Sequence, residues 1–166
     1  MSINTIVIIV IVSIVILWPI LKKAAKHIRI DNSEESIHIA CLYGDLPKIK
    51  RLLESGVNIN SKDFSNKTPL MYAAEDGAVD TIDYLIRNGA NINDIDVRGD
   101  SALIIALKNN NVKASKLLIE SGANLDIRNE DNKDALNIAS DIDSKEMVEL
   151  IKNKRDDNKD ITISSN

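Results

Sequence analysis

The chain has 166 residues, of which 44% are hydrophobic and 3% aromatic, and its formal net charge is −4. Residues 1–30 carry four basic and no acidic side chains, whereas residues 31–166 carry 17 basic and 25 acidic ones. The acidic body argues against nucleic-acid binding, which requires a clustered basic face. The single cysteine, Cys41, excludes an internal disulfide and a cysteine-based zinc site.

An uncharged apolar run opens the chain and covers residues 3–21. As a helix rising about 1.5 Å per residue, the run is nearly as long as a bilayer's hydrocarbon core is thick, about 30 Å. Trp18 and Pro19 lie near its end, where an indole suits the interface and a lost backbone hydrogen bond is most easily replaced. We therefore expect residues 1–21 to form a single transmembrane helix.

A cleaved signal peptide and a buried core helix are the alternatives for this segment. Residues 1–5 lack a basic side chain and two lysines follow the run, which disfavours a signal peptide, although the alanine pair at 24–25 keeps that possibility open. A buried helix would need a small domain to cover an apolar cylinder on every side. The basic connector at residues 22–32 follows the span, so the positive-inside rule places the body in the cytoplasm.

The body of the chain repeats itself every 33 residues. This step separates two series of small residues: Gly56, Gly89 and Gly122, and Ala40, Ala73, Ala106 and Ala139. A fixed period of this size indicates stacked supersecondary units rather than one globular core.

The pattern is fullest between residues 68 and 93. It reads TPLMYAA at 68–74, with glycine at 77 and GANIN at 89–93. This segment resembles the ankyrin repeat, whose signature has a period of 33 and the motif T-P-L-H-x-A. Similar segments place the repeats at about 34–62, 63–95, 96–128 and 129–153. The resemblance implies an all-α ankyrin-repeat solenoid over residues 33–153, with helix-turn-helix units joined by β-turn loops.

Local residue chemistry supports these boundaries. Thr68 suits a helix N-cap, and Pro69 then takes the first helical position. One equivalent turn position holds residues that tolerate positive φ, namely Asn66, Gly99 and Asn132. We expect each of these turns to be left-handed.

Order is expected to weaken toward the C-terminus. Asn110 and Asp143 occupy the position at which Gly77 closes an inner helix, and a left-handed conformation costs them more than glycine. Residues 154–166 are polar and lack a sustained apolar period, so we expect a disordered tail.

The sequence offers little support for catalysis. His38 and Cys41 would share one helix face, but the resemblance implies that the histidine supports a turn and the cysteine fills a small buried position. Acidic pairs such as Glu75-Asp76 lie at helix ends or in the tail rather than in a cleft. No phosphate-binding, serine-hydrolase or zinc-protease motif is present. We predict no enzymatic activity, cofactor, metal or small-molecule substrate.

The resemblance implies a concave binding surface built from turn tips and first helices. Its candidate partner-binding residues are Tyr43, Phe64, Ser65, Lys67, Glu75, Asp76, Val97, Arg98, Asp100, Lys108, Glu130 and Asp131. Phe64 and Val97 differ from the rest because nothing in the repeat requires an apolar tip. Aromatic and arginine side chains are favoured anchors at interfaces, so we expect these two residues to form a stripe beside Arg98.

The predicted function is protein binding at the cytoplasmic face of a membrane. One alternative is the same solenoid outside the cytoplasm, protecting or chaperoning an envelope partner enzyme. Another is an accessory protein whose catalytic unit lies on a separate chain.

Overall fold

The structure of the protein is a computed structural model that describes the backbone of residues 37–163 and the side chains of residues 37–157. Its helices are residues 37–42, α2 (Leu46–Glu54), α3 (Pro69–Asp76), α4 (Val79–Arg87), α5 (Ala102–Lys108), α6 (Val112–Glu120), α7 (Ala135–Asp141) and α8 (Lys145–Ile163). An isolated β-bridge joins Ile95 to Ser101, and the described range contains no strand. The all-α class is therefore confirmed for this part of the chain.

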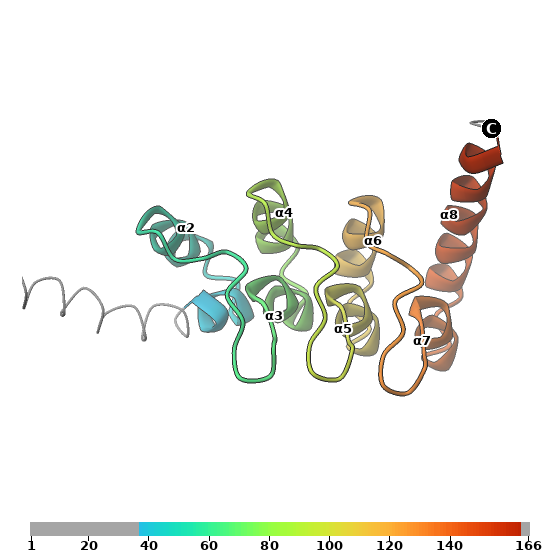
Figure 1. Ribbon diagram of the computed structural model, residues 1–166, viewed down its shortest axis with the longest axis horizontal. Helices are drawn as coiled ribbons and strands as arrows, with labels where there is room; N and C mark the ends of the chain where they lie inside the picture. The colour runs from blue at the N-terminus through green and yellow to red at the C-terminus, as the bar shows by residue number, and fades with distance from the viewer. Residues whose placement is uncertain (1–36, 164–166) are drawn as a thin grey trace, which may run out of the picture.

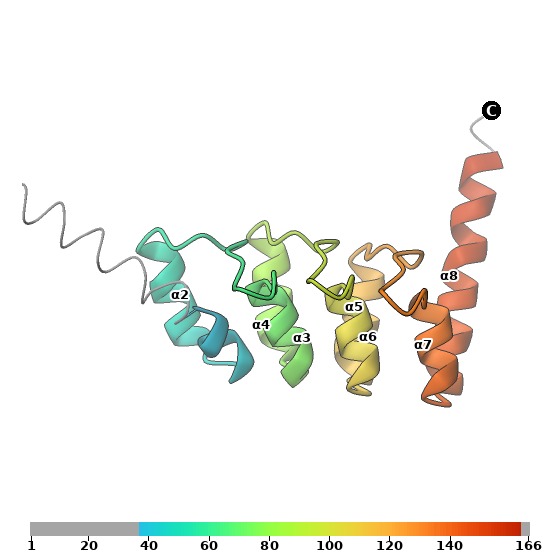
Figure 2. The same cartoon turned by 60° about the horizontal axis from the view of Figure 1, so that its bottom comes forward.

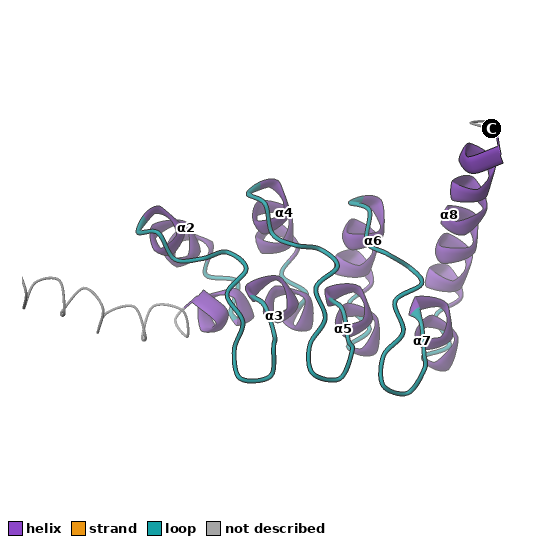
Figure 3. Ribbon diagram, in the orientation of Figure 1, coloured by secondary structure: helices purple, strands orange, loops and turns teal. Residues whose placement is uncertain are grey.

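The helices stand in antiparallel pairs that stack side by side. Residues 37–42, α3, α5 and α7 form an inner layer, while α2, α4, α6 and α8 form an outer layer (Figures 1 and 2). Within the layers, α3 packs on α5, α5 on α7, and α4 on α6. The loops between α2 and α3, α4 and α5, and α6 and α7 all project to the same side (Figure 3).

The core lies between neighbouring pairs rather than in one centre. Leu85 of α4 and Leu118 of α6 occupy equivalent positions 33 residues apart, and both side chains are fully buried. Three alanines of the predicted series, Ala73, Ala106 and Ala139, are also fully buried. Small side chains at these positions allow the inner helices to approach closely, as the period predicted.

Helix ends follow the predicted residue chemistry. Thr68 accepts a hydrogen bond from the backbone N–H of Met71, and Pro69 is the first residue of α3. Gly77 ends α3 with a φ of 77°, where an added Cβ would meet the side chain of Asn111 at 2.8 Å. The other left-handed residues include the predicted turn and helix-end positions Asn66, Gly99, Asn110, Asn132 and Asp143.

The C-terminal segment differs from the prediction. Helix α8 runs without interruption to Ile163, so the prediction of disorder is wrong for residues 154–163. The physical reason is a missing stop signal. Gly56, Gly89 and Gly122 follow α2, α4 and α6 with positive φ, whereas the equivalent position holds Arg155. Without a left-handed glycine the helix continues.

The predicted membrane span at residues 3–21 and the connector at 22–32 lie outside the described residues. Between residues 37 and 163, no helix combines the length and apolar character needed to cross a bilayer.

Candidate functional site

Each interhelical loop is a tight hairpin organised by one side chain at its base. Asp63, Asp96 and Asn129 hold this position in successive loops, each 33 residues after the last. In the first loop, Asp63 Oδ1 accepts hydrogen bonds from the backbone N–H groups of Ser65 and Lys67, both at 2.8 Å. Asp96 and Asn129 repeat this arrangement. These bonds fix the tip residues in one conformation.

Backbone hydrogen bonds also join one hairpin tip to the next. The N–H of Val97 donates to the carbonyl of Ser65 at 3.0 Å, and that of Glu130 donates to the carbonyl of Arg98 at 2.8 Å. The predicted tip residues are therefore brought together in a continuous line. We call Phe64, Ser65, Val97, Arg98, Glu130 and Asp131 the hairpin row.

Large apolar side chains are exposed on and near the start of this row. Phe64 is fully exposed and Val97 is 62% exposed. Tyr43, which follows the helix of residues 37–42, is 76% exposed. The other exposed large hydrophobic residues of the described part are Ile39 and Ile95. None of the five lies on an outer helix, so their distribution favours the hairpin side of the solenoid as a contact surface.

Several predicted site residues pair with one another instead of facing solvent freely. Lys67 Nζ lies 2.7 Å from Glu75 Oε2, and Lys108 Nζ lies 2.6 Å from Asp100 Oδ2. Asp100 is fully buried and also accepts a hydrogen bond from Asn129 at 3.0 Å. Its carboxylate cannot meet a partner at the surface, so we remove Asp100 from the candidate contacts. Its role is to join two hairpins.

Other predicted residues remain available at the surface. Ser65 and Asp76 are exposed and form no ion pair within the described part of the chain. Glu130 and Asp131 are likewise exposed and without a cationic partner among the described residues. The side chain of Arg98 is 54% exposed.

Sequence reasoning did not identify the polar network beneath the first hairpin. Tyr72 of α3 donates a hydrogen bond to Asp63 Oδ2 at 2.7 Å, and its ring packs against His38 with centroids 5.4 Å apart. Burial and then the bond to Asp63 raise the pKa of Tyr72 to about 12. The signal that could have revealed this base was the 33-residue spacing of Asp63, Asp96 and Asn129.

The histidine–cysteine pair has the structural roles that the resemblance implied. His38 Nε2 lies 3.1 Å from the carbonyl oxygen of Ser61, so the histidine ties the first inner helix to the following loop. Cys41 is fully buried, and burial raises the pKa of its thiol to about 12, which disfavours the reactive thiolate. The described residues contain no cluster of three or more potential metal ligands.

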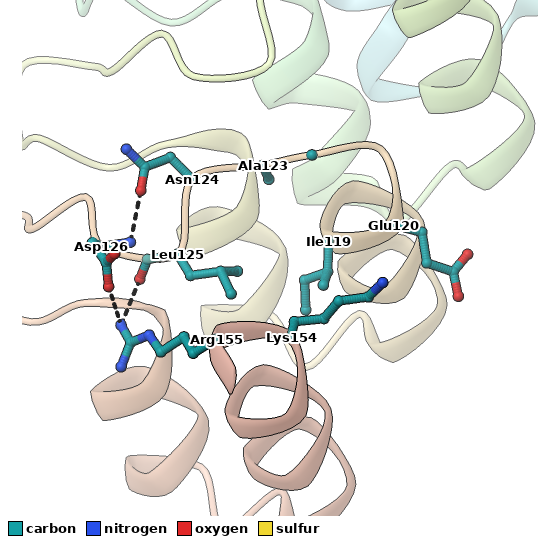
Figure 4. A pocket seen from close by; sticks show the side chains of 9 residues that line it. Ile119, Glu120, Ala123, Asn124, Leu125, Asp126, Lys154 and Arg155 are labelled. Atoms are coloured by element: carbon teal, nitrogen blue, oxygen red, sulfur yellow. Dashed lines mark hydrogen bonds and ion pairs between the residues drawn. The ribbon is translucent and has the colours of Figure 1, made fainter. Parts of the chain in front are cut away.

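An open pocket lies apart from the hairpin row, between the end of α6 and helix α8. Ile119, Glu120 and Lys154 line one side, while Asp126 and Arg155 form an ion pair on the other (Figure 4). The lining mixes both charge signs and already pairs its main cation, so the pocket is a weaker candidate than the row.

Comparison with known proteins identifies the repeat. The family described as Ankyrin repeats (3 copies) matches residues 13–96 and 93–164, which together span most of the chain. Comparison with curated proteins gives no match.

Proposed function

Because the chain belongs to the ankyrin-repeat family, we propose that it is a membrane-anchored module that binds a partner protein through its hairpin row. Ankyrin repeats generally mediate protein–protein interaction and are typically not enzymes. The proposal assigns four repeats to the solenoid, at about 34–62, 63–95, 96–128 and 129–153.

One observation carries the proposal: two apolar side chains stand on rigid, adjacent tips. Phe64 buries no surface in the folded chain, and Val97 is joined to the neighbouring residue Ser65 by a 3.0 Å backbone hydrogen bond. An exposed aromatic ring gains little within the monomer, but at the centre of an interface it can contribute 2 kcal/mol or more. Because both tips are held by backbone bonds, binding costs little ordering of the surface.

The membrane part of the proposal depends on the first thirty residues. Residues 3–21 carry no charge, and the basic side chains of residues 1–30 all follow that run. This arrangement favours a single-pass anchor with the ankyrin domain in the cytoplasm.

Crosslinking in native membranes followed by mass spectrometry tests the binding surface. Phe64→Ala combined with Val97→Ser is expected to abolish recovery of the main crosslinked protein while leaving Tm nearly unchanged, because both side chains are exposed. The matched control is Lys50→Ala with Arg51→Ala, two exposed positions on the outer helix α2. Equal recovery with the tip variant and the wild type would remove the hairpin row as the binding site.

The anchor is tested separately. A chain lacking residues 2–30 should be soluble and keep its helical circular dichroism, because every proposed repeat begins after that segment. Protease added to intact cells or spheroplasts should leave the ankyrin domain uncut. Digestion from outside would instead favour the extracytoplasmic alternative.

A further inference from the structure

We propose that the hairpin row binds an extended segment of the partner whose side chains change from apolar through acidic to basic along its length. This inference rests on the proposed function and specifies the chemistry of the partner. It follows from the order of the three tips, which carry Phe64-Ser65, Val97-Arg98 and Glu130-Asp131 in succession.

The first end of the row provides an apolar contact. Phe64 is fully exposed and Val97 is 62% exposed, and no acidic side chain occupies the tip of either hairpin. Lys67, the nearest cation after the first tip, is paired with Glu75 at 2.7 Å. An apolar side chain therefore complements this end.

The middle tip presents an oriented cation. Arg98 Nε lies 3.8 Å from Asp100 Oδ2 and 4.0 Å from Asp96 Oδ2, and both carboxylates are almost fully buried. Among the described residues, no hydrogen bond occupies the two terminal nitrogens of Arg98. Those nitrogens stand at the exposed end of the side chain, where a guanidinium fork matches a carboxylate. The partner's middle side chain is therefore acidic.

The last tip presents uncompensated negative charge. Glu130 and Asp131 are exposed, and the cations near them are already engaged. Lys133 lies 2.7 Å from Asp141, while Arg128 binds the carbonyl of Asn132 and the carboxylate of Asp134. A lysine or arginine of the partner therefore complements this end.

The spacing of the repeats sets the length of the segment. Packed helices lie about 8–10 Å apart, so successive tips are separated by a similar distance. An extended chain advances about 3.3 Å per residue, so about three residues separate successive contacts. A seven-residue segment therefore spans the row, with its apolar, acidic and basic side chains at the first, fourth and seventh positions.

Fluorescent peptides test this order against the full-length chain in detergent micelles at low ionic strength. The reference probe is Phe-Ser-Ser-Glu-Ser-Ser-Lys, synthesised also in the reversed direction. Two matched probes replace its central Glu by Gln or its terminal Lys by Glu. Exposed ion pairs contribute up to about 1 kcal/mol, so each replacement should weaken binding by about threefold to fivefold, measured by fluorescence anisotropy.

Two variants assign the two charge contacts. Arg98→Ala should erase the preference for Glu over Gln, and Glu130→Lys with Asp131→Lys should reverse the preference for terminal Lys over Glu. Equal affinity of the wild type for all probes, or no change of preference in either variant, would overturn the inference. That failure is distinct from failure of the proposed function, which is judged by crosslinking of the Phe64 and Val97 variant.

Discussion

The guanidinium of Arg155 lies 2.7 Å from Asp126 Oδ1, which joins helix α8 to the loop that follows α6 (Figure 4). In earlier loops the equivalent position is asparagine. The Oδ1 atoms of Asn60 and Asn93 accept the backbone N–H groups of Asn91 and Asn124, each at 2.8 Å. At the third position, aspartate replaces asparagine and an arginine side chain replaces the backbone donor. Asp126 and Arg155 thus complete a bonding pattern that the loops alone do not continue.

Replacing Arg155 by alanine should destabilise the C-terminal pair of helices. Arg155 Nη2 also lies 2.9 Å from the carbonyl oxygen of Leu125 and 3.2 Å from Asp134 Oδ2, and the Asp134 side chain is only 8% exposed. Hydrogen bonds to charged groups contribute about 1.5–3 kcal/mol, so we expect the free energy of unfolding to fall by about 2 kcal/mol in urea titrations.

The neighbouring residue provides the control for this prediction. Lys154→Ala removes a cation that forms no ion pair among the described residues, and should change stability by less than about 0.5 kcal/mol. A third variant, Arg155→Gly, restores the residue type that follows the shorter outer helices, so its helical circular dichroism should decrease. If the arginine and lysine variants are equally stable, α8 does not depend on Arg155.

A second prediction concerns the buried carboxylate of Asp100. Lys108 neutralises it at 2.6 Å, whereas the equivalent pair in the preceding repeat is reversed in sign and joins Lys67 to Glu75. Lys108→Met leaves a fully buried carboxylate without its main partner and should cost about 3–5 kcal/mol in the free energy of unfolding.

The matched variant, Lys67→Met, leaves Glu75, whose side chain is 37% exposed and can be solvated. Its cost should stay below about 1 kcal/mol. Equal losses in the two variants, compared in the same denaturant titration, would contradict the interpretation of Asp100 as a dependent buried charge.

The repeat and its turns could be predicted because local chemistry decides them. Thr68 and Pro69 start a helix by their own side chains, and Asn66 and Asn132 adopt positive φ as their residue type allows. The period then places Leu85 and Leu118 in equivalent buried positions without knowledge of the tertiary structure. For these elements, local preference and global packing agree.

Burial of single polar residues could not be predicted in the same way. Asp100 occupies the position equivalent to Lys67, which suggested an exposed tip residue. Its burial depends on Lys108, one helix later, and on Asn129, in the next hairpin. The extent of α8 was missed for a similar reason. The polar composition of residues 154–163 indicated disorder, while the contacts of Arg155 lie on distant loops.

A third prediction concerns the reactivity of the single cysteine. Burial raises the pKa of Cys41 to about 12, so the thiolate is scarce at neutral pH and the sulfur is inaccessible. A chromogenic disulfide reagent should react with the folded protein at least a hundredfold more slowly than with the protein in concentrated urea. Rapid modification of the folded chain, with its circular dichroism unchanged, would show that this part of the inner layer opens readily.

The last prediction concerns acid. Burial tends to raise the pKa of Asp63, but hydrogen bonds from Tyr72 and from the backbone of Lys67 and Ser65 outweigh it, so the pKa is lowered from its ordinary value of 3.8. The pKa of Asp134 is also lowered, because the backbone of Asn137 and the side chain of Arg155 outweigh its burial.

A lowered pKa in the folded state means that the folded protein binds protons less readily than the unfolded chain. The stability contributed by these carboxylates is therefore present above the unfolded pKa of about 3.9 and is lost as pH falls through the lower folded value. Urea midpoints should change little between pH 6 and pH 5 on account of these two groups, and should fall steeply below about pH 4.

Asp63→Asn isolates the charge with little change of shape, because Asn129 already occupies the equivalent position and accepts the same two backbone bonds. This variant should be less stable than wild type at pH 6, and its urea midpoint should fall less steeply below about pH 4. Asp141→Asn removes an exposed carboxylate and serves as the control. If the Asp63 variant loses stability between pH 4 and pH 2.5 as steeply as the wild type does, the hairpin carboxylate does not govern the acid transition.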